Sequence, residues 1–569
     1  MEGANSNNKI RIGLAFSGGG FRASFFHLGV IRRLEELGIM KDIEVISTVS
    51  GGSILGTYYL CQMEKERRSG LYDNDRVAMC DAIIEKFYNA VRTNMRMRAI
   101  TFAPLFHPVL FFFKSLLGSS NRAVRMAQQF KRNFFSPDLK LDDLPSSPEI
   151  LINTTSNSTG KRVVFFKDEM NTFSSQISKV EYNKLPLAKV VGASAAVPGV
   201  FPPVPIANDL FSDGGVVDNQ GLESLFDYFY FTKDNTLDRV SVKSPIEKGD
   251  RVFILCSDAS GQIEVQDMPK KTGIASAIRS TSILQATNRN KVLKLLKQYC
   301  DDSDCALTEF AFINLSKNLK NWESQEVGVK NYQKIKERLR SEFITPVSQI
   351  RTDLDEFDLI ESLSLMYHGY TLINRQIDAY CPALTNNYNL RINEFDGWTP
   401  SFLTEENLTG SDKTVNGNKQ ELPPEKKREF IAKRLAIGSQ LIFRNIRKEK
   451  KTFIPLLIVS FLPMLLILLS PLRKFLFCQT GDNGNGLGTF IAENIIKKIS
   501  HFIPKLWTLF ETNGRYGDIP IFFSDLIVLS LLIYLSLFLY WVLNRSFVSR
   551  LYKKDFTKVS PAGSKIPFS

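Results

Sequence analysis

The chain of 569 residues is long enough for two or three domains, and its 44% hydrophobic and 23% charged residues form a globular composition with an apolar addition. The net charge of +13 gathers near the C-terminal apolar segments, which favours a membrane partner, and no basic face suited to nucleic acid can be located. Seven scattered cysteines predict reduced thiols in a cytosolic compartment, and the polar residues 1–8 predict no signal peptide.

The first predicted strand, residues 10–16, runs into a glycine-rich loop and then into an amphipathic helix through Glu36. Consecutive glycines between a strand and a helix expose backbone N–H groups at the helix N-terminus, where the helix dipole favours an anion. A dinucleotide-binding loop needs a wider glycine spacing, so an oxyanion hole for acyl transfer is the better interpretation. The candidate oxyanion residues are Gly18, Gly19, Gly20, Phe21 and Arg22.

A second short strand, Val45–Val49, ends at Ser50 and is followed by Gly51, Gly52 and an apolar run that can open a helix. A serine on such a strand–turn–helix elbow has its hydroxyl exposed at the end of the sheet, and the small residues permit the tight turn. The usual elbow pattern is Gly-x-Ser-x-Gly, and Thr48 stands here in place of the first glycine. The alternative is a serine that caps an ordinary strand–helix turn.

Asp213 follows a third apolar segment and precedes Gly214 and Gly215, which predicts another strand that ends in a sharp turn. A carboxylate at this place is a candidate base for Ser50. The alternative is an ordinary Asp-Gly turn, which is a common feature of proteins.

Histidines are scarce, and a Ser-His-Asp triad would need one of them near Ser50. The four are His27, His107, His368 and His501. Only the last two follow Asp213, the chain order of an α/β-hydrolase triad, and both lie far beyond the last recognisable catalytic strand. A Ser-Asp dyad therefore fits the available residues better than a triad.

Together these segments resemble the patatin-like phospholipases, a family with an arginine-bearing glycine loop, a serine elbow and an Asp-Gly-Gly or Asp-Gly-Ala segment. The matching stretches are 18–22, 49–52 and 213–215, with 192–199 as the helix-to-loop segment before the aspartate, and the resemblance covers residues 9–225. It implies a Ser50–Asp213 dyad and an oxyanion hole at the glycine loop, with no metal or cofactor. Arg22 adds charge to that hole, binds a lipid phosphate, or pairs structurally with a loop carbonyl.

The expected fold class is α/β: a three-layer patatin-like domain with a mostly parallel central sheet, then a helical extension and C-terminal transmembrane helices. The aromatic run 101–118 is a lid, a lipid-interface segment or part of the core. The predicted divisions are 9–270 catalytic domain with an insertion at 61–145, 271–385 helical extension, 386–424 linker, 425–452 basic juxtamembrane helix, 453–543 transmembrane hairpin and 544–569 basic tail.

Two apolar runs, Phe453–Ser470 and Leu526–Leu543, are each about 18 residues long, the lower limit for crossing a bilayer. Between them, residues 487–510 carry apolar side chains on one helical face, which predicts an amphipathic helix on the membrane surface. Basic residues flank both outer ends, so the catalytic domain is expected to face the cytoplasm.

These observations predict an integral membrane serine lipid acyl hydrolase that acts on phospholipid or lysophospholipid esters in the bilayer. Two alternatives remain: an inactive membrane scaffold that keeps the fold, and a lipase for neutral acylglycerols. The sequence does not specify the head group, the acyl position or the oligomeric state.

Overall fold

The protein is described from a computed structural model of residues 1–569. The residues that it describes are 9–70, 75–92, 121–135, 139–167, 179–198, 200–229, 246, 249–260, 273–301, 306–316, 339–390, 397–409, 422–440, 447–469, 536, 539, 547–548 and 550–561.

An eight-stranded sheet forms the centre of the fold, with strand order β5-β6-β3-β2-β1-β7-β8 and with β4 paired to β3. Its strands are β1 Ile10–Phe16, β2 Ile43–Val49, β3 Glu149–Ser156, β4 Arg162–Phe165, β5 Val204–Ile206, β6 Asp209–Asp213, β7 Arg251–Asp258 and β8 Leu307–Asn314. The pairs β3–β2, β2–β1, β1–β7 and β7–β8 are parallel, whereas β4, β5 and β6 join antiparallel. The predicted mostly parallel α/β sheet is confirmed.

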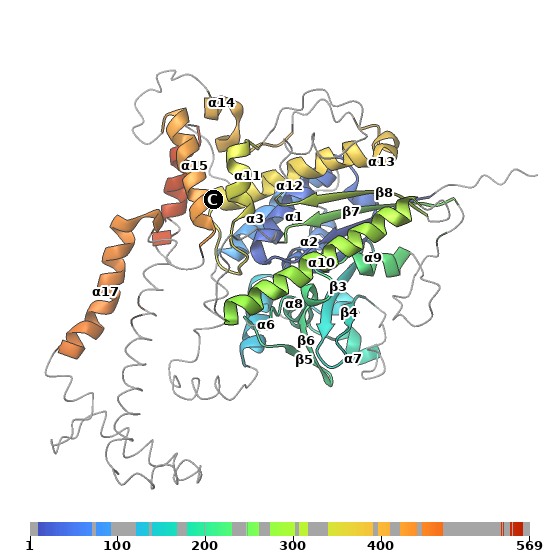
Figure 1. Ribbon diagram of the computed structural model, residues 1–569, viewed down its shortest axis with the longest axis horizontal. Coiled ribbons are helices and arrows are strands. Elements are labelled where there is room, and N and C mark those ends of the chain that lie inside the picture. Colours follow the sequence, from blue (N-terminus) through green and yellow to red (C-terminus); the bar gives the residue numbers. More distant parts are fainter. Residues whose placement is uncertain are drawn as a thin grey trace, which may run out of the picture. The chain divides into compact units, whose positions relative to one another are not determined.

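Both faces of this sheet are buried, as the continuous apolar runs of its parallel strands require. In β1, Leu14 and Phe16 belong to one core cluster, while Ala15 belongs to a second cluster on the opposite face. Helices α1 Gly20–Glu36, α2 Gly51–Ser69 and α12 Leu359–Tyr380 contribute to the first cluster, and α9 Leu222–Phe229 and α10 Gly273–Asp301 to the second. The result is a three-layer arrangement, in which α10 crosses one face of the sheet (Figure 1).

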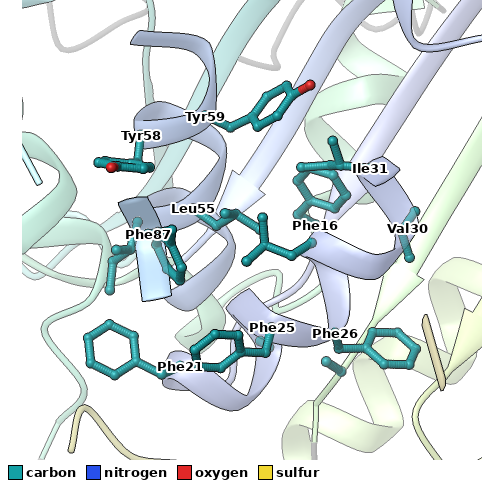
Figure 2. Packing of buried hydrophobic residues seen from close by; sticks show 14 of the residues in the cluster. Phe16, Phe21, Phe25, Phe26, Val30, Ile31, Leu55, Tyr58, Tyr59 and Phe87 are labelled. Carbon is teal, nitrogen blue, oxygen red and sulfur yellow. The ribbon is translucent and has the colours of Figure 1, made fainter. Parts of the chain in front are cut away.

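Aromatic side chains fill the space between α1, α2 and α3 Arg76–Val91 (Figure 2). Phe21 and Phe25 of α1 lie with their ring centroids 6.4 and 5.8 Å from that of Phe87 in α3. Tyr58 and Phe134 also contact Phe87, each at a centroid distance of 5.4 Å. The range 61–145, predicted as an insertion, therefore supplies core residues, while the aromatic run 101–118 within it lies outside the described residues.

The range 271–385, predicted as a helical extension, also completes the catalytic sheet. Strand β8 comes from this range and pairs in parallel with β7, and α12 packs along α1. Strand β8 mixes buried and half-buried residues and contains Glu309 between apolar ones, a short pattern easily mistaken for a helical stretch. The remaining helices of this part are α6 Asn121–Asn133, α7 Lys179–Asn183, α8 Leu187–Ser194, α11 Ser341–Ser348, α13 Pro382–Asn387, α14 Glu405–Thr409 and α15 Pro424–Gly438.

Two compact units divide the chain: Met1–Thr101, Ser120–Leu441 and Asp555–Ser569 form the first, and Phe102–Ser119 and Ile442–Lys554 the second. Helix α15, in the range predicted as juxtamembrane, lies within the first unit and buries Ile431 and Leu435 in its core. Near the other end of the chain, Asp555 forms an ion pair with Arg434 of α15 at 3.0 Å.

In the second unit, helix α17 Lys450–Leu469 packs Phe453 and Leu456 against Val548, Leu551 and Tyr552. Within the described ranges, the structure contains no helix that combines the length and the apolar character needed to cross a bilayer. The predicted transmembrane helices are therefore not supported by the described residues. The amphipathic segment 487–510 and, apart from two isolated residues, the predicted span 526–543 lie outside the described residues.

Helices α1 and α12 approach so closely that two glycines form their contact. A Cβ atom placed on Gly29 would lie 1.8 Å from the Met366 carbonyl oxygen, and one on Gly369 would lie 2.1 Å from the Phe26 carbonyl oxygen. No side chain can be accommodated at these distances without separating the two backbones. Since α1 also carries the glycine loop at its start, this helix contact fixes the position of the candidate site.

Gly29→Ala is therefore expected to lower the free energy of unfolding by about 2 kcal/mol or more, because its methyl group would overlap backbone atoms. The matched control is Gly192→Ala in α8, where an added Cβ would lie at an ordinary 3.5 Å from the Ala127 Cβ. Chemical denaturation of both variants tests this prediction. Equal stability of the two variants would contradict the close contact between α1 and α12.

Candidate active site

Ser50 stands at the turn between β2 and α2, in a strained backbone conformation. Its φ and ψ angles are 51° and −114°, and a positive φ is costly for a residue other than glycine. The Ser50 N–H donates to the Ser194 hydroxyl at 3.0 Å, which holds the turn in place. This is the geometry of a nucleophile elbow.

The elbow depends on the absence of side chains at Gly51 and Gly52. A Cβ on Gly51 would lie 2.1 Å from the Gly20 carbonyl oxygen, and one on Gly52 would lie 2.5 Å from the Phe16 carbonyl oxygen. The N-termini of α1 and α2 are therefore pressed together beside Ser50. The Ser24 hydroxyl ties the two helices further by donating to the Gly51 carbonyl at 2.8 Å.

Thr48, which departs from the usual elbow pattern, is accommodated by a glycine one turn into α2. A Cβ on Gly56 would lie 2.8 Å from the Thr48 Cγ2, so the glycine missing before the serine is compensated at Gly56. The Thr48 hydroxyl donates to the Leu151 carbonyl at 3.1 Å and accepts a hydrogen bond from Ser53. Threonine at this position is thus compatible with the elbow.

Two polar residues missed by the sequence prediction support the elbow from the neighbouring elements. Ser194, at the end of α8, donates to the Asn153 carbonyl at 2.6 Å and accepts the Ser50 N–H. The Asn153 side chain, on β3, donates to the Thr48 carbonyl at 3.0 Å and the Ser47 hydroxyl at 2.9 Å. The small-residue segment 192–199 was noticed in the sequence, but nothing in it revealed that Ser194 reaches the elbow.

Only part of the predicted oxyanion loop has free amide groups. The Gly18 N–H donates to the Asn219 carbonyl at 3.0 Å, and the Phe21 N–H donates to the Asp353 carbonyl at 2.9 Å. By contrast, the N–H groups of Gly19, Gly20 and Gly51 donate to no residue that the structure describes. These three amides lie at or beside the first turns of α1 and α2, where the helix dipoles are positive.

Arg22 pairs with loop carbonyls, which was one of the alternatives left open by the sequence. Its guanidinium donates to the Ile350 carbonyl at 2.9 Å and to the Ala259 carbonyl at 3.0 Å. The side chain is buried, and burial lowers the Arg22 pKa to about 10. In this arrangement the arginine fixes the loop that contains Ile350.

Asp213 lies at the end of β6, held by its own backbone and by the turn that follows. Its N–H donates to the Ala196 carbonyl at 3.0 Å, and its Oδ1 accepts the Gly215 N–H at 2.7 Å. Burial raises the pKa of Asp213 to about 6, and hydrogen bonding from the Ser50 hydroxyl and the Gly215 amide opposes that rise. The other carboxylate oxygen, Oδ2, is buried and accepts no hydrogen bond of ordinary geometry from the described residues.

The Ser50 hydroxyl and the Asp213 carboxylate are therefore neighbours. Hydrogen bonds between such groups are often long or poorly aligned in ligand-free proteins. Asn219, which the sequence did not single out, lies between the glycine loop at Gly18 and the turn at Gly215. A Cβ on Gly18 would lie 2.5 Å from the Asn219 Oδ1 and 3.3 Å from the Ser50 Cβ, and one on Gly215 would lie 2.4 Å from the same Oδ1.

The two described histidines are engaged away from this pair. His27 lies with its ring nitrogens 2.7 Å from the Ser257 hydroxyl and 3.0 Å from the Ser17 carbonyl oxygen. His368 contacts the Leu315 carbonyl at 2.9 Å, and burial lowers the pKa of each histidine to about 4. His107 and His501 lie outside the described residues, and the described part of the chain contains no cluster of ligands suited to a metal ion.

An α/β sheet with a serine held in a strained turn between strand and helix is the architecture of serine acyl hydrolases. Residues 14–226 match a family model described as patatin-like phospholipase. The chain therefore carries a patatin-like phospholipase domain, and with it the chain is a lipid acyl hydrolase.

Among solved structures, two remote similarities accompany this match. The crystal structure of VipD from Legionella pneumophila is 12% identical with a TM-score of 0.26, over 98% of this chain and 89% of that one. Human GIVD cytosolic phospholipase A2 is 10% identical with a TM-score of 0.36, over 67% of this chain and 60% of that one. No curated protein matches the sequence. The family assignment rests on residues 14–226 and not on these remote similarities.

Proposed function

We propose that this lipid acyl hydrolase cleaves carboxylic esters of phospholipids or lysophospholipids through a Ser50–Asp213 dyad. The observation that carries the proposal is the buried Asp213 carboxylate beside the Ser50 hydroxyl, whose hydrogen bond influences the Asp213 pKa. Both described histidines have other partners, so within the described residues Asp213 is the group suited to act as base.

In the acylation step, the Ser50 oxygen attacks the ester carbonyl carbon while Asp213 accepts the hydroxyl proton. The carbonyl oxygen gains negative charge, and the N–H groups of Gly19, Gly20 and Gly51 are available to stabilise it. When the tetrahedral intermediate collapses, the C–O bond to the leaving alcohol breaks and Asp213 returns the proton to that oxygen. The products are an acyl-serine and the lyso-lipid alcohol.

In the deacylation step, Asp213 accepts a proton from a water molecule, whose oxygen attacks the acyl-serine carbonyl. The same amide groups stabilise the second intermediate, and the proton returns to the Ser50 oxygen as the fatty acid leaves. One carboxylate thus serves as base and acid in both steps. Neither step requires a metal or cofactor.

Ser50→Ala is expected to reduce ester turnover by about four orders of magnitude or more, since it removes the nucleophile. It should also abolish labelling by a fluorophosphonate serine probe. The measurements are the kinetics on a soluble short-chain ester and the probe signal of purified protein. Both also test the alternative of an inactive scaffold.

Ser53→Ala is the matched control, because Ser53 lies one helical turn away and its hydroxyl contacts Thr48 and Ser194 rather than Asp213. This variant should keep the probe labelling. A folded Ser50→Ala protein with near-normal turnover would refute the proposed nucleophile.

Activity is expected to fall as the pH drops through about 6, because a base must be unprotonated and burial raises the pKa of Asp213 to about 6. Below this value kcat/KM should decrease about tenfold per pH unit, and above it the profile should be flat until another group titrates. His27→Gln and His368→Gln should leave the acidic limb in place. A limb that disappears in either folded histidine variant would reveal a triad.

The same proposal includes attachment to a bilayer through residues 453–543, with the catalytic domain in the cytoplasm. Its support is the sequence alone: two apolar runs with basic residues on their outer flanks. The full chain expressed in cells should then sediment with membranes and resist a high-salt wash. Its catalytic domain should also be digested by protease added to sealed vesicles from the cytoplasmic side. Release of the full chain by salt would refute this anchoring.

A further inference from the structure

Helix α10 is fastened directly over the loop that follows Asp213. The Gln285 side chain donates to the Gly215 carbonyl at 2.9 Å, and the Gly215 N–H in turn donates to the Asp213 carboxylate. About two and three helical turns further along, Val292 and Leu296 are buried in the core cluster on that face of the sheet. The inner face of α10 thus packs against the sheet and the loop after Asp213 (Figure 1).

The outer face of α10 presents large apolar side chains to solvent. Leu284 is 64% exposed, and Ile283 and Leu295 are also exposed. Leu284 and Leu295 are separated by three helical turns, so they lie along one stripe of the helix. Isolated exposed leucines are ordinary, but several on one helix beside a candidate lipid site mark a contact surface.

Basic residues accompany these apolar side chains. Lys291, Lys294 and Lys297 are exposed on the same helix, and the sequence of α10 contains no acidic residue before Asp301. A helix with one face packed, an apolar stripe outside and basic residues as its only charged residues before Asp301 is complementary to an anionic lipid surface.

The turns around Asp213 also expose apolar side chains. Val216, three residues after Asp213, is 42% exposed. Val197 and Val200 are exposed in the turn after Ala196, whose carbonyl accepts the Asp213 N–H. Large apolar side chains are therefore exposed on α10 and on both loops that hold the candidate base.

We infer that the outer face of α10, together with the exposed valines beside Asp213, is a docking surface for bilayers that contain anionic phospholipids. Docking there brings the site to the lipid that holds its substrate. The inference rests on the proposed function only in taking a membrane lipid as substrate. The surface itself belongs to the first unit, whereas the apolar residues 453–543 belong to the second.

The test compares full-length proteins in a sedimentation assay with phosphatidylcholine vesicles prepared with and without phosphatidylserine. The wild type should partition more strongly to vesicles that contain phosphatidylserine. Reversing two charges with Lys291→Glu/Lys294→Glu should weaken this partition about tenfold or more, since each lysine near an anionic surface contributes about fivefold. Ile283→Ser/Leu284→Ser should weaken partition to both kinds of vesicle.

The charge-matched control is Lys41→Glu/Lys65→Glu. Both lysines are exposed, Lys41 just before β2 and Lys65 near the end of α2, away from the Ser50 elbow. This variant carries the same change in net charge and should partition like the wild type. If it loses as much binding as the α10 variant, the attraction is a property of net charge and the docking surface is refuted.

Activity on a soluble short-chain ester separates this inference from the proposed function. The α10 variants should retain that activity and lose activity on phospholipid vesicles to the extent that they lose binding. If the wild type hydrolyses no ester, the proposed function fails while vesicle partition still tests α10. Unchanged vesicle partition in both α10 variants would overturn the docking surface and leave the proposed function standing.

Discussion

The candidate site depends on one steric constraint, the contact between the first turns of α1 and α2. Gly51 approaches the Gly20 carbonyl to a distance at which no Cβ fits, so both helix N-termini meet beside Ser50. Each helix start contributes unpaired amides and a positive dipole end to the same small volume. The strained φ of Ser50 is tolerated because Ser194 and Asn153 hold the turn from outside.

The positive potential at the candidate site comes from backbone N–H groups rather than from a cationic side chain. Arg22, the nearest candidate cation in the glycine loop, has its guanidinium committed to carbonyls of residues 350 and 259. Burial raises the pKa of Asp213 to about 6, and hydrogen bonding from Ser50 and Gly215 limits this rise. The carboxylate is therefore mostly unprotonated near neutral pH. This balance suits a group that must accept a proton and then return it, because its two protonation states are close in free energy.

The order of elements could be predicted from the sequence, because turn chemistry and apolar periodicity are local properties. Strand β1, the glycine loop and the Ser50 elbow follow from such patterns, and the structure has them at the predicted places. Strand β8 could not be predicted in the same way. It lies at the edge of the sheet and is only half-buried at several positions, where Thr308 and Glu309 interrupt its apolar pattern.

By itself, the sequence determined which residues stand at the ends of strands: Ser50 after β2, the glycine loop after β1 and Asp213 in β6. Tertiary structure alone decided which of these groups are available. Asn219 and Asp353 occupy two of the amides predicted for the oxyanion hole, and Gly56 makes room for Thr48. The reason is physical. Whether an amide or a guanidinium is free depends on the acceptor atoms that folding brings to it from distant parts of the chain, and the spacing of residues within one segment does not predict those contacts.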